Sequence, residues 1–100
     1  MDLFAYRNGE LYCEDVPLRR IAEQVGTPTY VYSAGTFIEH YRRTVAAFAE
    51  LNPIVCYSIK SCQNIHIIRL LASHGAGMDV VSGGELYRAL QGGADPAKIV

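Results

Sequence analysis

Lysine is scarce in this chain, which holds only Lys60 and Lys98 among nine positively charged residues. Ten acidic residues offset those charges and leave a formal net charge of −1, so the sequence has no basic field for nucleic acid. No apolar run approaches the about 18 residues of a membrane-spanning helix. The start, Met1-Asp2-Leu3-Phe4, lacks the basic and apolar pattern of a leader. We therefore expect no nucleic-acid or membrane partner and a cytoplasmic location.

Cysteine is also scarce, and its spacing excludes two kinds of small protein. Cys13, Cys56 and Cys62 are odd in number and show no CxxC spacing, so the sequence indicates neither a disulfide framework nor a zinc site. Half of the 100 residues are hydrophobic, which predicts a soluble, well-packed domain with a modest core. We expect no metal site.

The chain repeats a unit of one strand followed by one helix. Strand patterns cover 29–33, 54–60 and 78–82, and a fourth begins near residue 98, at intervals of 20 to 25 residues. This rhythm predicts an α/β fold with a parallel sheet. No GxGxxG motif follows the first strand, which favours a barrel over a dinucleotide-binding fold. A (β/α)8 TIM-type barrel takes about 250 residues, so residues 29–100 are expected to form its first three βα units and the start of strand four.

Two further local features are expected. Residues 1–28 do not follow the βα rhythm: they predict a hairpin around Asn8-Gly9 and a short helix over 17–24, a lead-in that packs on something other than the barrel. The helix that begins at Gly83-Gly84 is expected to bury Leu86, Ala89 and Leu90.

Lys60 ends the apolar run 54–59, where an ammonium group needs an explanation. Burying an unpaired lysine is costly, and such a lysine either loses its proton or is used covalently, as in lysines that form Schiff bases. The alternative from position alone is a lysine that extends its methylene groups along the strand end toward solvent. Position alone leaves both interpretations open.

Three ordered motifs carry a family resemblance. The chain resembles the N-terminal part of the barrel-type, pyridoxal-phosphate-dependent amino-acid decarboxylases, and within them the diaminopimelate decarboxylase family. The motifs are Gly26-Thr27-Pro28-Thr29-Tyr30-Val31-Tyr32, Cys56-Tyr57-Ser58-Ile59-Lys60-Ser61, and residues 75–86, read as GAGMDVVSGGEL.

The resemblance implies that Lys60 is the Schiff-base lysine that holds pyridoxal 5'-phosphate. Period-two alternation along a strand would place Cys56, Ser58 and Lys60 on one face. The family commonly has alanine at the position of Ser58, and serine is nearly as small, so room beneath the cofactor ring is kept. We therefore include Ser58 among the expected cofactor-binding residues.

Two carboxylates complete the expected site. Asp79 lies on the strand next to that of Lys60, where it could hold the released ammonium charged and oriented; a structural ion pair is the alternative. Glu85 falls in the first turn of a helix, where a place near the cofactor and a favourable interaction with the helix dipole explain it equally well. We expect Asp79 to serve catalysis and cofactor binding, and Glu85 cofactor binding.

The resemblance implies a carboxy-lyase that converts meso-2,6-diaminopimelate to L-lysine and CO2 as a homodimer. It also places the phosphate loop and the substrate-binding residues beyond Val100, and the lead-in beside a separate β domain of the full-length protein. The 100-residue chain is accordingly expected to be incomplete and inactive alone. Two alternatives share the lysine: another barrel-type amino-acid decarboxylase or racemase, and a non-catalytic regulatory protein that carries the cofactor.

Overall fold

The structure, a computed structural model, describes residues 2–100 and divides into two compact units, residues up to Phe37 and residues from Ile38. Each unit is described by itself. The helices and strands are β1 (Phe4–Arg7), β2 (Glu10–Cys13), β3 (Val16–Pro17), α1 (Leu18–Val25), α2 (Ala34–Ala47), β4 (Cys56–Ser58), α3 (Ile65–Ser73), β5 (Gly77–Asp79) and α4 (Gly83–Gln91), with 3₁₀ turns η1 (Ala49–Leu51), η2 (Ile59–Ser61) and η3 (Pro96–Lys98).

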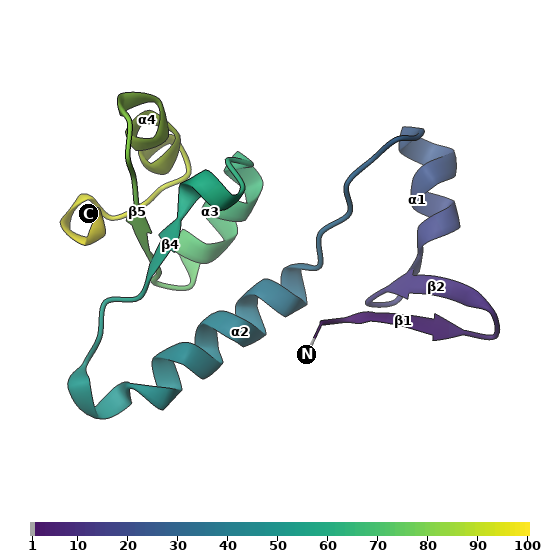
Figure 1. Cartoon of the computed structure of the whole chain (residues 1–100), viewed down its shortest axis with the longest axis horizontal. Coiled ribbons are helices and arrows are strands. Elements are labelled where there is room, and N and C mark those ends of the chain that lie inside the picture. The colour runs from purple at the N-terminus through teal and green to yellow at the C-terminus, as the bar shows by residue number, and fades with distance from the viewer. Residues whose placement is uncertain (1) are drawn as a thin grey trace. The chain divides into compact units, whose positions relative to one another are not determined.

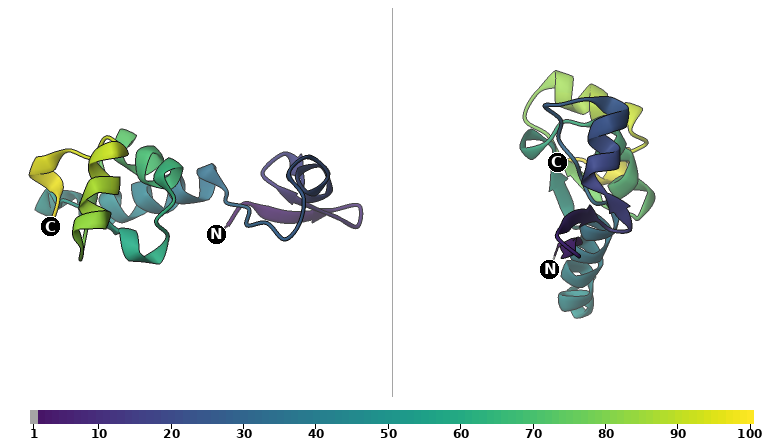
Figure 2. Two further views of the ribbon diagram at one scale, coloured as in Figure 1. Left: turned by 90° about the horizontal axis from the view of Figure 1, so that it is seen from above. Right: turned by 90° about the vertical axis from the view of Figure 1, so that its right-hand side faces the viewer.

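The first unit contains the predicted hairpin. Strands β1 and β2 pair in antiparallel fashion around Asn8 and Gly9, whose φ angles of 51° and 79° both lie in the left-handed region that a tight type I′ turn requires. Strand β3 pairs with β2, and α1 packs against β2 and β3 (Figures 1 and 2). The lead-in is therefore a three-stranded antiparallel sheet with one helix, as the Asn-Gly signal indicated.

The predicted strand over 29–33 is wrong. In the described part of the chain these residues pair with no strand, and Tyr30 is 89% exposed. A run of β-branched and aromatic residues becomes a strand only when another strand takes up its backbone hydrogen bonds. Ser33 is buried as expected of a cap: its Oγ accepts a hydrogen bond from the Thr36 backbone N at 3.0 Å, which starts α2.

Glu14 joins the lead-in sheet to the start of α2. Its carboxylate accepts hydrogen bonds from the Gly35 backbone N and the Ser33 Oγ, each at 2.8 Å. These two hydrogen bonds, with that of Gly35 the stronger influence, lower the pKa of the Glu14 carboxyl group. A Cβ on Gly35 would lie 2.6 Å from Leu3 Cδ1, so a larger residue there would displace the exposed Leu3 side chain.

The second unit shows the predicted parallel sheet. Strands β4 and β5 are parallel, with Tyr57 opposite Met78 and Ser58 opposite Asp79. Ile99 forms a parallel bridge to the other side of Met78, and the Val100 backbone N donates to the Met78 carbonyl at 3.0 Å. An isolated parallel bridge thus lies where the start of a further strand was predicted.

Helices α3 and α4 build the core of the second unit on this sheet (Figure 1). Ile59, Ile68 and Met78 are fully buried, and α3 adds Ile67 and Leu71. The predicted inner face of α4 is partly wrong. Ala89 is fully buried, but Leu86 and Leu90 are 41% and 45% exposed because the buried face of α4 runs through Glu85 and Ala89 instead. No helix within residues 2–100 has the length and apolar character needed to cross a bilayer.

Candidate functional site

Lys60 does not lie on the strand that was predicted to carry it. Strand β4 ends at Ser58, and Lys60 is the middle residue of the 3₁₀ turn η2 (Ile59–Ser61). The cause is Ile59, which is fully buried and whose carbonyl accepts from the Cys62 backbone N at 3.1 Å. Lys60 therefore does not share a strand face with Cys56 and Ser58 through period-two alternation, and its side chain is exposed just past the carboxyl end of the strand.

Two side chains brace this turn from within. The Ser61 Oγ donates to the Ser58 carbonyl at 2.7 Å, and the Tyr57 Oη donates to the Cys62 carbonyl at 3.0 Å. Each bond gives a carbonyl group a hydrogen-bond donor, that of Ser58 at the end of β4 and that of Cys62 after the turn. The amine of Lys60 makes no hydrogen bond or ion pair within residues 2–100. The backbone of the turn is fixed, and the amine is accessible and unpaired there.

The two faces of the β4–β5 pair differ in character. Met78 on β5 is fully buried, so the side chain of its neighbour Asp79 points to the opposite face of the sheet. Ser58, the register partner of Asp79, shares that face. The Ser58 Oγ is buried and, within the part of the chain that the structure describes, has no hydrogen-bond partner. A donor without an acceptor therefore lies beside a carboxylate at the carboxyl ends of both strands.

Asp79 is placed on the strand next to β4, as predicted. Its carboxylate forms no ion pair with the Lys60 amine within residues 2–100, so the two groups are more than 4.0 Å apart. The predicted roles of Asp79 in orienting the ammonium and binding the cofactor stay predictions. The predicted strand 78–82 is also shorter, since β5 ends at Asp79 and Val81 is 67% exposed.

Glu85 is a buried carboxylate with its two oxygens already engaged. The residue is 5% exposed; Oε2 accepts from the Val81 backbone N at 2.8 Å and Oε1 accepts from Gln63 Nε2 at 3.3 Å. Ser82 caps the same helix by accepting from the Glu85 backbone N at 3.2 Å. Glu85 thus serves the helix start, and its predicted contact with a cofactor stays a prediction. Gln63 was missed by sequence reasoning, although a glutamine three residues after the lysine was a signal to examine.

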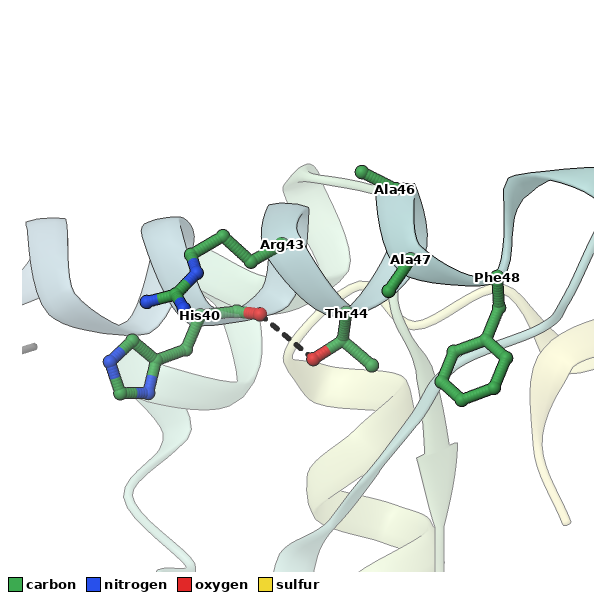
Figure 3. A pocket seen from close by; sticks show the side chains of 6 residues that line it. All are labelled: His40, Arg43, Thr44, Ala46, Ala47 and Phe48. Atoms are coloured by element: carbon green, nitrogen blue, oxygen red, sulfur yellow. Dashed lines mark hydrogen bonds between the residues drawn. The ribbon is translucent and has the colours of Figure 1, made fainter.

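One hollow lies elsewhere, on one side of α2 and the residue that follows it (Figure 3). The Thr44 Oγ1 there donates to the His40 carbonyl at 2.9 Å, a bond within the helix. The hollow contains none of the predicted site residues; its lining is His40, Arg43, Thr44, Ala46, Ala47 and Phe48. A hollow on a single helix brings together no second element, and we assign it no chemistry.

Known proteins resemble this chain closely. The family model described as "Pyridoxal-dependent decarboxylase, pyridoxal binding domain" matches residues 34–100. The chain belongs to the pyridoxal-dependent decarboxylase family. The diaminopimelate decarboxylases of Pseudomonas aeruginosa and Haemophilus influenzae are 49% and 43% identical to it over 100 residues. Each match covers 100% of this chain and 24% of the relative.

Solved structures agree with the fold. Diaminopimelate decarboxylase of M. jannaschii in complex with L-lysine superposes with a TM-score of 0.92 at 36% identity, covering 98% of this chain and 24% of that chain. A protein of Aquifex aeolicus gives a TM-score of 0.91 at 42% identity, covering 97% of this chain and 24% of that chain. The chain spans about a quarter of the length of the curated relatives it matches. The predicted fold, the N-terminal part of a pyridoxal-binding α/β barrel, is confirmed.

The residues of the second unit fit the cofactor that the family description names. Pyridoxal phosphate needs a primary amine for covalent attachment, and Lys60 offers one that is accessible and unpaired within residues 2–100. The buried Ser58 hydroxyl, which lacks a partner there, is a donor that a bound ring could satisfy. The predicted cofactor, pyridoxal phosphate, is therefore supported both by family membership and by the residues at the strand ends.

Proposed function

We propose that this chain contributes the lysine-bearing part of an enzyme that decarboxylates meso-2,6-diaminopimelate to L-lysine and CO2. The observation that carries the proposal is the free amine of Lys60, which follows the first parallel strand within the segment matched by the pyridoxal-binding domain. Relatives with the printed name diaminopimelate decarboxylase, at 43% to 49% identity over the whole chain, support the choice of substrate. A carboxy-lyase is thus favoured over a racemase or a regulatory protein.

Each site residue has a separate task in this proposal. Lys60 would hold the cofactor through Nζ and would be a free amine again once the substrate is bound. When bound, pyridoxal phosphate supplies an electron sink for the pair of electrons left behind as CO2 departs. The Ser58 hydroxyl, buried on the same sheet face as Asp79, binds and orients the ring. The Asp79 carboxylate, on the neighbouring strand, directs the released Lys60 amine toward the site.

The remaining expectations are also proposed for the full-length protein. We propose a homodimer in the cytoplasm, on the strength of the family resemblance and of a reaction that belongs to amino-acid biosynthesis. We also propose that the lead-in, residues 1–28, packs with a separate β domain. Its three-stranded antiparallel sheet and the start of the family match at residue 34 support that division.

Reductive trapping tests the proposed function. The longest available form of the protein is incubated with pyridoxal phosphate, reduced with borohydride and digested for peptide mass analysis. A pyridoxyl adduct is expected on Lys60, whereas Lys98, whose Nζ donates to the Gly75 carbonyl at 3.3 Å, provides the internal control. The Lys60→Arg variant should lose the adduct and the Lys98→Arg variant should keep it. Diaminopimelate should be turned over only by forms that carry Lys60; a folded wild-type protein without the adduct would refute the proposal.

A further inference from the structure

We propose that Gln63 and Glu85 form a latch that holds the turn carrying Lys60 against the start of α4, and that both are positioning residues. The inference rests on the proposed function for the role of Lys60. It also gives Glu85 a task other than the cofactor contact predicted from sequence.

The turn η2 is shaped by its own hydrogen bonds and anchored by the burial of Ile59. The bonds made by Ser61 and Tyr57 both end on carbonyl groups within residues 57–62. Gln63, two residues after the turn, makes hydrogen bonds to the neighbouring helix. Its Nε2 donates to Glu85 Oε1, and its carbonyl accepts from Arg88 Nη1, each at 3.3 Å. Two bonds from α4 thus hold the residue that follows the lysine turn.

Glu85 is suited to be the fixed half of this latch. At 5% exposure it is held by α4, and its backbone N is bound to the Ser82 Oγ. A buried carboxylate needs donors for both oxygens, and here these are the Val81 backbone N and the Gln63 amide. Removing the Gln63 amide would leave the buried Glu85 carboxylate with one donor fewer, so its burial favours the hydrogen bond to Gln63.

The latch connects the two strand ends that carry the proposed site. Val81 follows β5, which ends at Asp79, and Gln63 follows the turn that carries Lys60. One carboxylate therefore binds the segment after each strand. Because displacements near 1 Å at a reacting group can lower rates by about 10²-fold, a bond that fixes these segments relative to one another has a direct consequence for the amine.

Exchanging the two side chains tests the latch. Gln63→Glu sets a second carboxylate against Glu85 and removes the donor. The double variant Gln63→Glu/Glu85→Gln restores both bonds with reversed polarity, because an amide at position 85 can accept from Val81 and donate to position 63. Gln63 is exposed, so its substitution leaves the core intact. Gln91→Glu, at the exposed end of α4, is the matched control for added charge.

Two measurements on the longest available form report on the latch without the cofactor. Hydrogen exchange of residues 57–64 should become about tenfold faster in Gln63→Glu and return to within about threefold of wild type in the double variant. The ratio of Lys60 to Lys98 acetylation by acetic anhydride should change in Gln63→Glu and return toward the wild-type value in the double variant. Gln63→Leu should shift both readouts in the same direction by a smaller factor, and Gln91→Glu should shift neither.

The outcomes separate the latch from the proposed function. If Gln63→Glu leaves exchange and acetylation at wild-type values, or if the double variant recovers neither, the latch is refuted even when the pyridoxyl adduct forms on Lys60. If the exchange and acetylation pattern is as expected but wild-type protein forms no adduct, the latch stands and the proposed function fails.

Discussion

Ser58 and Asp79 are register partners on adjacent parallel strands, yet the buried Ser58 hydroxyl makes no hydrogen bond to the Asp79 carboxylate or to any other group in residues 2–100. A buried hydroxyl without an acceptor costs about 1–3 kcal/mol. At the carboxyl ends of β4 and β5, the unsatisfied Ser58 hydroxyl therefore lies on the same sheet face as the Asp79 carboxylate. The cost is recovered when an acceptor arrives.

Replacing Ser58 by alanine should have opposite effects on the free and the loaded protein. The cofactor-free form should become more stable, by up to about 1–3 kcal/mol, because the unsatisfied hydroxyl is gone. The affinity for pyridoxal phosphate should fall by about fivefold to tenfold, the loss expected for one hydrogen bond. Thermal unfolding of the cofactor-free form and equilibrium dialysis measure the two effects.

Ser61→Ala is the matched control for Ser58→Ala, because the Ser61 hydroxyl already donates to the Ser58 carbonyl. This control should lower the stability of the cofactor-free form instead of raising it. A Ser58→Ala protein that is less stable and binds the cofactor as tightly as wild type would show that the Ser58 hydroxyl has a structural partner and no ligand.

Replacing Glu14 by glutamine should remove a pH-dependent part of the stability. The pKa of Glu14 is lowered in the folded chain by its hydrogen bonds to Gly35 and Ser33, so its contribution is complete above the unfolded-state value of about 4.3 and is lost as the pH falls through the lower folded value. Wild type should exceed Glu14→Gln in melting temperature at pH 7, and the two should converge toward about pH 3.

The control for this charge change is Glu23→Gln, since Glu23 is exposed on α1. Its melting temperature should follow wild type across the same pH range. A constant difference between Glu14→Gln and wild type from pH 7 to about pH 3 would contradict the capping role of the carboxylate.

Replacing Gly92 by alanine should destabilise the second unit by about 1–3 kcal/mol through overpacking. The backbone there is ordinary, with φ −75°, but a Cβ would lie 2.5 Å from Ile68 Cγ2, and Ile68 is fully buried. Gly84→Ala is the control, because its Cβ would meet Ser82 Oγ no closer than 4.0 Å. It should leave stability unchanged or raise it by up to about 1 kcal/mol. Urea unfolding of both variants decides, and a Gly92→Ala protein as stable as Gly84→Ala would contradict the packing argument.

The sequence predicted features that depend on short-range chemistry. The turn at Asn8-Gly9 follows from the residues at those positions, and the structure confirms it. The parallel pairing of the strands near 56 and 78 followed from the spacing of apolar runs. The position of Asp79 on the next strand could be inferred before any contact was known, whereas Lys60 was predicted to be the last residue of its strand and lies in the turn that follows.

Other features depend on contacts between distant residues and could not be inferred. The segment 29–33 has strand-forming residues but no partner strand within residues 2–100, and pairing with a distant strand is not encoded locally. Strand β4 ends two residues early because Ile59 is drawn into the core. Leu86 and Leu90 matched the helical period, but burial of Glu85, whose donors come from Val81 and Gln63, fixes a different inward face for α4.

The bridge from Met78 to Ile99 shows the order of the parallel segments in this sheet. β5 has β4 on one side and Ile99 on the other, so three successive parallel segments are laid down in one direction. In open α/β sheets, ligands occupy the crevice where the order of strands reverses. No reversal occurs among these segments, so they create no such crevice. In a barrel, the site lies instead at the carboxyl ends of the strands, and the carboxyl ends of β4 and β5 are Ser58 and Asp79.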